Sequence, residues 1–239
     1  MKTLLYSPSL RSGRRGFSLL ELLTVLVIIS IMSALVVAAI GSLGKADGFN
    51  SATTALSTLL EQARAYAMAN NTYVFVGIEE TDASQPAGGA QNSGIGRVAL
   101  QAYASLDGTL NLAAGNRQAI DRLQILNNLH IPASLSATSG TLANRPSADY
   151  SLGSSTGSTS YPTVSSGNII TAGNFTFTKV IAFDALGVVH IPTSPAISGF
   201  QYIEIDAEPT NGTVISTNTT NVSAIQIDAT TGAVTVFRS

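Results

Sequence analysis

A single stretch of the sequence, residues 17–40, limits most strongly what this chain can become. Its 24 residues are mostly apolar and carry one charge, Glu21. At about 1.5 Å of rise per residue, a helix of this length reaches about 36 Å, which is enough to cross the apolar core of a bilayer. A lone carboxylate inside such a helix is costly, so Glu21 needs a positively charged partner.

The charges of the chain are distributed unevenly around this stretch. Residues 1–16 contain no acid and four bases, namely Lys2, Arg11, Arg14 and Arg15. Without that segment, eight bases would stand against 14 acids, a net charge of −6. Basic flanks stay on the cytoplasmic side of a membrane, so the N-terminus is expected to be cytoplasmic and the bulk of the chain extracytoplasmic.

The overall composition excludes several kinds of chemistry. With 45% hydrophobic and 11% charged residues, the chain can form an apolar core. A formal net charge of −2 disfavours nucleic-acid binding, which requires a basic surface. The absence of cysteine excludes disulfides, thiolate zinc sites and a cysteine nucleophile.

Two simple interpretations of the N-terminus are a secretory signal cleaved near residues 37–39 and a plain transmembrane anchor. The apolar stretch is longer than the roughly 7–15 residues of a signal core. An anchor fits the length of the stretch. Neither interpretation gives Glu21 a partner.

The octapeptide RRGFSLLE resembles the leader junction of type IV prepilins and of type II secretion pseudopilins. Arg14 and Arg15 precede Gly16 in this octapeptide. The aromatic Phe17 follows, and Glu21 is the fifth residue after the glycine. The resemblance implies cleavage between Gly16 and Phe17, with methylation of the new amino group of Phe17. Cleavage there would leave the apolar helix in the mature protein.

The same resemblance supplies the missing partner of Glu21. A free amine at Phe17 of one subunit can neutralise Glu21 of its neighbour, and a buried acid tolerates a low dielectric only when it is paired. The implied partners are a prepilin peptidase, other pilin-like subunits and assembly platform proteins. The implied location is the inner membrane, crossed once, followed by a filament. No cofactor and no nucleic acid is expected.

The expected fold is α+β and pilin-like, with a long N-terminal helix packed on an antiparallel β-rich head. A basic leader would occupy residues 1–16, and a membrane or filament-core helix residues 17–40. A glycine hinge and an amphipathic half-helix would occupy residues 41–70. The head would be formed by residues 71–239.

The second half of the helix carries one apolar stripe. Three glycines between residues 41 and 48 weaken the helix, either as a hinge or as a point that melts on assembly. From Phe49 onward, apolar residues recur at steps of three and four, which predicts a buried face. The stripe consists of Ala52, Leu56, Leu59, Leu60, Ala63, Tyr66 and Ala67.

Beyond Asn71 the apolar pattern changes to period two, with many β-branched and aromatic residues, which predicts strands. Two stretches rich in small and polar residues, about 81–96 and 134–174, are expected to be irregular loops. The strands are expected at 73–78, 97–103, 123–125, 175–183, 188–191, 201–206, 224–227 and 233–237.

Two turns stand out among these strands. Asp184 with Gly187, and Asp228 with Gly232, follow apolar runs and predict hairpin loops. Together the two turns resemble the head of H-type minor pseudopilins. The overall pattern is also similar to the pilin-like Verru_Chthon cassette proteins.

The two histidines lie in near-identical contexts, LHIPAS around His130 and VHIPTS around His190. On adjacent edge strands, their imidazoles could form half of a metal site or a catalytic pair. Alternatively, they mark two strand ends that are stopped by proline.

Three classes of function follow. The first is a structural, non-enzymatic pilin-like subunit, minor rather than major because of the H-type turns, the long loops and the absence of a C-terminal disulfide. The second is a membrane-anchored or tip-displayed adhesin whose Ser/Thr-rich loops contact a ligand. The third is an exported enzyme.

Overall fold

The structure is a computed structural model in which the chain forms two compact units, Met1–Leu43 and Gly44–Ser239. It describes residues 18–133, 135, 140–153, 159–193, 197, 199–216 and 221–239, without the side chains of residues 35–47, 140 and 141.

One long helix and a set of mostly short strands make up the described chain. The helix is α1 (Leu19–Asn70), and three 3-10 helices are η1 (Ala114–Asn116), η2 (Gly140–Asn144) and η3 (Ser166–Asn168). The strands are β1 (Val74–Asp82), β2 (Gly96–Ser105), β3 (Arg117–Ala119), β4 (Gln124–His130), β5 (Tyr150–Ser151), β6 (Thr159–Ser160), β7 (Ile170–Ala172), β8 (Phe175–Phe177), β9 (Lys179–Phe183), β10 (Val189–His190), β11 (Tyr202–Asn211), β12 (Val214–Ile215), β13 (Ser223–Asp228) and β14 (Val234–Arg238).

The helix α1 continues through the glycine-containing stretch 41–48, within which the boundary between the two units falls. It ends at Asn70 in a left-handed cap. Asn71 has a φ of 50°, and the amide of Thr72 donates to the carbonyl of Ala67 at 3.2 Å. This is the bond of a Schellman motif, with asparagine in place of the usual glycine.

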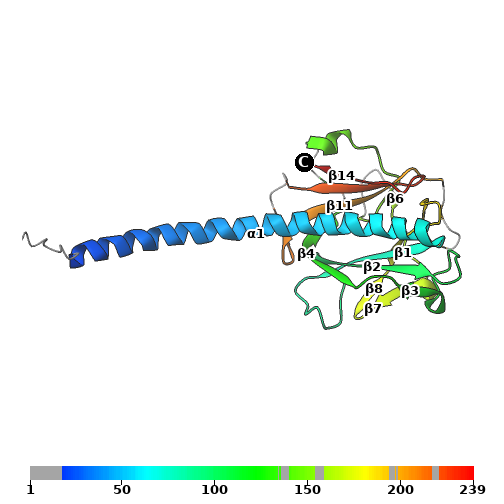
Figure 1. The fold of residues 1–239 in the computed structure, drawn as a ribbon, viewed down its shortest axis with the longest axis horizontal. Coiled ribbons are helices and arrows are strands. Elements are labelled where there is room, and N and C mark those ends of the chain that lie inside the picture. The colour runs from blue at the N-terminus through cyan, green and yellow to red at the C-terminus, as the bar shows by residue number, and fades with distance from the viewer. Residues whose placement is uncertain are drawn as a thin grey trace, which may run out of the picture. The chain divides into compact units, whose positions relative to one another are not determined.

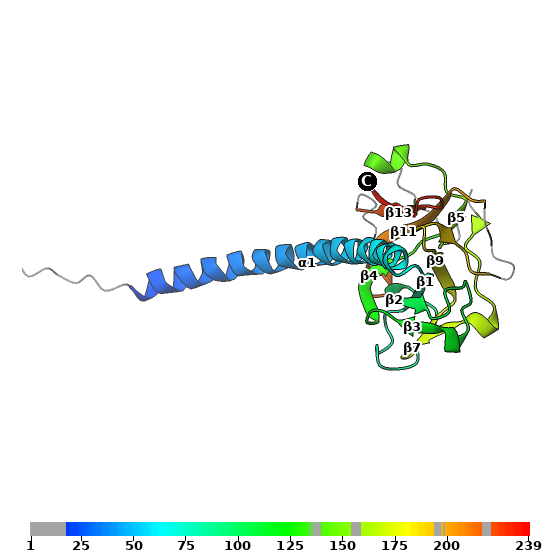
Figure 2. The same cartoon turned by 45° about the vertical axis from the view of Figure 1, so that its right-hand side comes forward.

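A large sheet packs against the second part of α1. Its main path runs β10-β9-β1-β2-β4-β11-β13-β14, with antiparallel neighbours throughout. Figures 1 and 2 show the helix lying between the strands β11 to β14 on one side and β1 and β2 on the other. The combination of a long helix and a β-rich head confirms the predicted α+β class.

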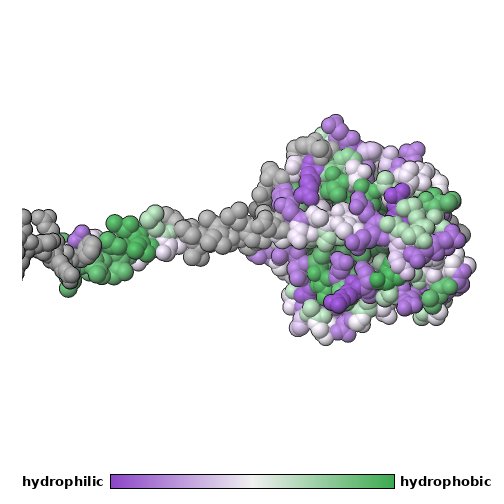
Figure 3. All heavy atoms as spheres, viewed as in Figure 1, coloured by the Kyte–Doolittle hydropathy of each residue, from purple (hydrophilic) through white to green (hydrophobic). Residues whose placement is uncertain are grey.

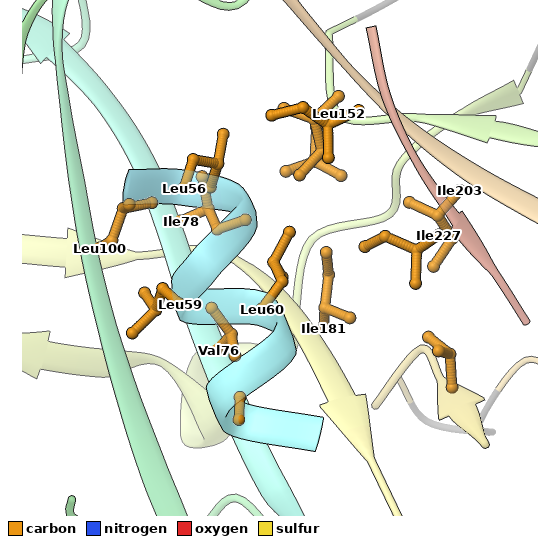
Figure 4. Close-up of a cluster of buried hydrophobic side chains, with 14 of the residues drawn as sticks. Leu56, Leu59, Leu60, Val76, Ile78, Leu100, Leu152, Ile181, Ile203 and Ile227 are labelled. Atoms are coloured by element: carbon orange, nitrogen blue, oxygen red, sulfur yellow. The ribbon is translucent and has the colours of Figure 1, made fainter. Parts of the chain in front are cut away.

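The main core lies between the helix and the sheet. Leu56, Leu59 and Leu60 point from α1 toward inward-facing strand residues such as Ile181 and Ile203 (Figure 4). Each buried aliphatic side chain of this size contributes about 1.5–3 kcal/mol to stability. The predicted stripe is therefore confirmed except at Tyr66, which is 38% exposed because it lies at the margin of the buried face.

A second core lies on the opposite face of the sheet. The β7-β8 hairpin covers Phe75 and Ala182 there, and Phe177 of β8 is fully buried. The hairpin lies so close to β1 that a Cβ added at Gly77 would come within 2.6 Å of the Phe177 ring. The absence of a side chain at Gly77 therefore allows this layer to close.

Both predicted turns are hairpin loops. The carboxylate of Asp184 accepts hydrogen bonds from the amides of Leu186 and Val188, and Gly187 adopts a φ of +81°. Asp228 accepts bonds from the amides of Thr230 and Thr231 in the same way. The aspartates therefore stabilise the turns, as the sequence predicted.

The two turns also meet each other, which the sequence did not indicate. The amide of Val189 donates to the carbonyl of Ala229 at 2.8 Å. A Cβ at Gly232 would lie 2.1 Å from the carbonyl oxygen of Gly187, so only glycine fits there. This contact joins β10 at one end of the sheet path to the β13-β14 hairpin at the other.

Strands occur at all eight positions where they were predicted, although the 175–183 segment is divided into β8 and β9. The short strands β3, β5, β6, β7 and β12 were not predicted. The stretch 134–174 is not wholly irregular, because its described residues include η2, β5, β6, η3 and β7.

Replacing Gly77 by alanine is expected to force Phe177 out of its position and to lower the free energy of unfolding by about 1–3 kcal/mol. The matched control is Gly115→Ala, since a Cβ there meets no atom within 4 Å. Chemical denaturation of both variants measures the difference. Equal stability of the two variants would contradict the proposed close packing at Gly77.

Candidate assembly and processing site

The described part of α1 begins with a capped turn around Glu21. The Oγ of Ser18 accepts a hydrogen bond from the amide of Glu21 at 3.1 Å. Ser18 and Glu21 have the spacing of a capping box, in which the serine satisfies an amide that has no partner within the helix. Glu21 therefore lies in the first turn, where the positive end of the helix dipole favours a carboxylate.

The apolar residues on either side of Glu21 are exposed among the residues that the structure describes. The large apolar side chains between residues 19 and 32 point in all directions around the helix. Each of them is at least 49% exposed. Figure 3 shows this surface as largely hydrophobic. Monomeric soluble proteins seldom expose contiguous apolar patches larger than a few hundred Å². The residues are Leu19, Leu20, Leu22, Leu23, Val25, Leu26, Val27, Ile28, Ile29, Ile31 and Met32.

Two hydroxyl groups on this part of the helix bond to carbonyl groups of the helix itself. The Oγ1 of Thr24 donates to the carbonyl of Glu21 at 2.9 Å, and the Oγ of Ser30 donates to the carbonyl of Leu26 at 2.8 Å. Such back-bonding is compatible with an apolar environment, because it gives these two hydroxyl donors partners within the helix. Glu21 is consequently the one charged side chain of residues 18–34 that needs an external partner.

The remaining residues of the expected cleavage junction, Arg14, Arg15, Gly16 and Phe17, lie outside the described residues. Within the part of the chain that the structure describes, no helix has both the length and the apolar character needed to cross a membrane.

The two histidines do not share a site. His130 Nδ1 lies 2.8 Å from Oε1 of Glu80, whereas His190 Nε2 lies 2.9 Å from Oδ2 of Asp184. His190 pairs with Ala182 of β9, which in turn pairs with Phe75 of β1. Glu80, the partner of His130, lies five residues beyond Phe75 along β1. At about 3.4 Å per residue, the two positions are about 17 Å apart along the strand.

Each histidine instead has a structural carboxylate partner that the sequence did not indicate. Asp184 also holds the β9-β10 turn, and Glu80 also accepts the amides of Gly96 and Ile131. Among the described residues, no cluster of three His, Cys, Asp or Glu side chains could hold a metal ion. The paired contexts of the two histidines thus mark strand ends, and the geometry does not support a joint site.

A buried acid pair lies on the face of β11 that points away from the helix. Ile203 and Ile205 point into the main core, while Glu204 and Asp206 point to the other side and are 6% and 1% exposed. Arg145 Nε donates to Oε2 of Glu204 at 3.0 Å. Within the described residues, Oδ1 of Asp206 has no hydrogen-bond partner.

This environment keeps Asp206 protonated near neutral pH. Burial, followed by the neighbouring charge of Glu204, raises the pKa of Asp206 from 3.8 to about 8. The Arg145 guanidinium offsets part of this effect. Folding therefore takes up a proton that the unfolded chain releases above pH 3.8.

We predict that the head loses stability as the pH rises. The contribution of the protonated Asp206 is fully present below pH 3.8 and is lost as the pH rises through about 8. Between these two pH values, the uptake of one proton on folding lowers the free energy of unfolding by about 1.4 kcal/mol for each unit that the pH rises. The variant Asp206→Asn should flatten this dependence and be more stable than the wild type at pH 8 and above, as measured by thermal unfolding between pH 5 and 9.

The variant Glu61→Gln removes one negative charge at an exposed position of α1 and serves as the matched control. It is expected to follow the wild-type curve. A wild-type slope retained in Asp206→Asn would show that the proton is bound elsewhere.

The N-terminal region matches one protein-family model. Residues 11–37 match the prokaryotic N-terminal methylation motif. Comparison with curated proteins and with solved structures found no match. The matched range includes the whole RRGFSLLE octapeptide and most of the apolar segment 17–40. The chain thus carries the N-terminal methylation motif of the type IV prepilin and pseudopilin family.

Proposed function

We propose that the chain is a structural subunit of a type II secretion or type IV pilus-like filament, cut between Gly16 and Phe17 and N-methylated at Phe17. The observation that carries the proposal is the methylation motif at residues 11–37, together with the apolar side chains that are exposed in its described part. A prepilin peptidase would remove the basic leader with Arg14 and Arg15. The exposed side chains would then be covered first by lipid and later by other pilin-like subunits.

Glu21 would provide the contact that sets the register between subunits. The ion pairs recorded among the described residues involve Glu80, Asp184 and Glu204, so Glu21 is available for a partner. After cleavage, the new amine would lie two residues before the first residue of α1, close to the capped turn that presents Glu21. The amine of one subunit would thus neutralise the carboxylate of the next.

The proposed location before assembly is the inner membrane, with the N-terminus cytoplasmic and the head extracytoplasmic. This rests on the sequence of the whole segment 17–40, which has the length of a single crossing. It rests also on the four bases before that segment. Assembly platform proteins would extract the subunit from the bilayer.

We infer a minor rather than a major subunit. The support is the pair of aspartate-glycine hairpins at Asp184 and Asp228, which resemble the H-type minor pseudopilins, together with the absence of cysteine. An adhesin or other binding module is the alternative, and it gains support from a cleft in the head described below.

The substitution Glu21→Ala tests the proposal. It should leave leader cleavage and membrane insertion intact, because it removes a charge from an apolar helix. It should reduce recovery of the subunit in sheared filaments by tenfold or more, since an unpaired buried amine costs several kcal/mol and 1.4 kcal/mol is already tenfold. Immunoblots of the membrane and sheared fractions measure both effects.

The control is Glu61→Ala, which removes an exposed acid from the head-packed part of the same helix. It should assemble as the wild type does. Recovery of Glu21→Ala in filaments at the wild-type level would contradict the proposed pairing.

A further inference from the structure

The unit Gly44–Ser239 contains a cleft whose lining residues have no part in the proposed pairing of Glu21. It lies beside the C-terminal end of α1 and encloses about 510 Å³, within the range of about 300–1,000 Å³ that is usual for ligand pockets. Its lining includes Ala104 and Ser105 of β2 and Gln118 and Ala119 of β3, which pairs with β2. Tyr66 and Asn70 contribute to the lining from the last turn of the helix.

The shape of the cleft is fixed by the local backbone. The Schellman cap at Asn71 turns the chain sharply from the helix into β1. The Oγ1 of Thr72 then donates to the carbonyl of Ser105 at 2.9 Å, which ties the helix end to β2. The cleft is therefore preformed between two rigid elements, which lowers the cost of ordering a bound ligand.

None of the residues that line the cleft is charged. Three charged residues are adjacent to lining residues in the sequence, and each already has hydrogen-bond partners within the chain. Asp121 accepts a hydrogen bond from the amide of Ala102 through Oδ1. Arg117 donates to the carbonyls of Leu112 and Ile169. The Asp107 carboxylate accepts bonds from Ser105, Thr109 and Asn116. An ionic ligand would find no counter-charge on these walls.

Several polar groups in the cleft are available to a ligand. Within the described chain, the hydroxyl of Tyr66 and the side-chain amides of Asn71 and Gln118 have no protein partner. Each of these groups can both donate and accept a hydrogen bond. The partly exposed ring of Tyr66 adds a flat apolar surface beside them.

We propose that this cleft binds a neutral oligosaccharide, such as a stretch of an uncharged exopolysaccharide. Sugar hydroxyls both donate and accept, which matches amides and hydroxyls better than it matches charged groups. The C–H face of a sugar ring is apolar and fits against an aromatic ring. The site goes beyond the filament function and does not depend on it, because every lining residue belongs to the compact unit Gly44–Ser239.

The test uses the full-length chain in a detergent without a sugar headgroup. The protein is applied to an array of neutral and acidic oligosaccharides. Its affinity for the neutral oligosaccharide that binds most strongly is then measured by calorimetry. We expect binding to neutral members of the array. Tyr66→Ala should raise the Kd at least tenfold and Gln118→Ala several-fold, since each removes one of the free groups.

The matched control is Met68→Ala, which alters an exposed residue of the same helix turn that does not line the cleft. It should bind as the wild type does. Gln118 and Tyr66 are both exposed, so their substitution leaves the fold intact, and circular dichroism verifies this.

Three results would overturn the proposal. One is no binding of any neutral oligosaccharide at millimolar concentration, and another is binding of acidic oligosaccharides alone. The third is neutral binding that neither Tyr66→Ala nor Gln118→Ala weakens. Because Glu21→Ala does not touch the cleft, failure of this test is distinguishable from failure of filament assembly.

Discussion

An apolar helix that begins with a single carboxylate imposes the main physical constraint on this chain, because both the apolar surface and the charge need partners. Residues 19–32 expose large apolar side chains in all directions around the helix. Glu21 is capped into the first turn by Ser18 and has no cation beside it among the described residues. Lipid can cover the apolar surface, but a positively charged partner is needed for the carboxylate. In the proposed function, cleavage after Gly16 would supply such a partner, the new amine at Phe17.

The head satisfies its own packing needs, which allows it to act as an independent unit. The second part of α1 buries its leucine stripe against the sheet, and the β7-β8 hairpin seals the outer face over Gly77. The two ends of the strand path meet where Gly187 and Gly232 come into contact. The uncharged cleft beside Tyr66, which we propose as a ligand site, lies in this unit.

Local patterns predicted much of the fold but little of what depends on distant contacts. The alternating strands, the leucine stripe and the two aspartate turns were readable because their signals lie within a few residues. Short strands such as β3 and β5 have no such pattern and exist only because a longer strand pairs with them. The carboxylate partners of the two histidines were not predicted. Glu80 lies 50 residues from His130 in the chain, so no local pattern joins them. The periodic pattern of the helix likewise could not show that Tyr66 lies at the margin of the buried face and lines the cleft.

Mass spectrometry of the mature N-terminus from native membranes tests the central claim most directly. The account predicts a chain that starts at Phe17, with a methyl group on its amine and the apolar helix retained. A chain that starts near residue 40 would contradict the account, because the segment would then be a discarded signal and Glu21 would be absent from the mature protein.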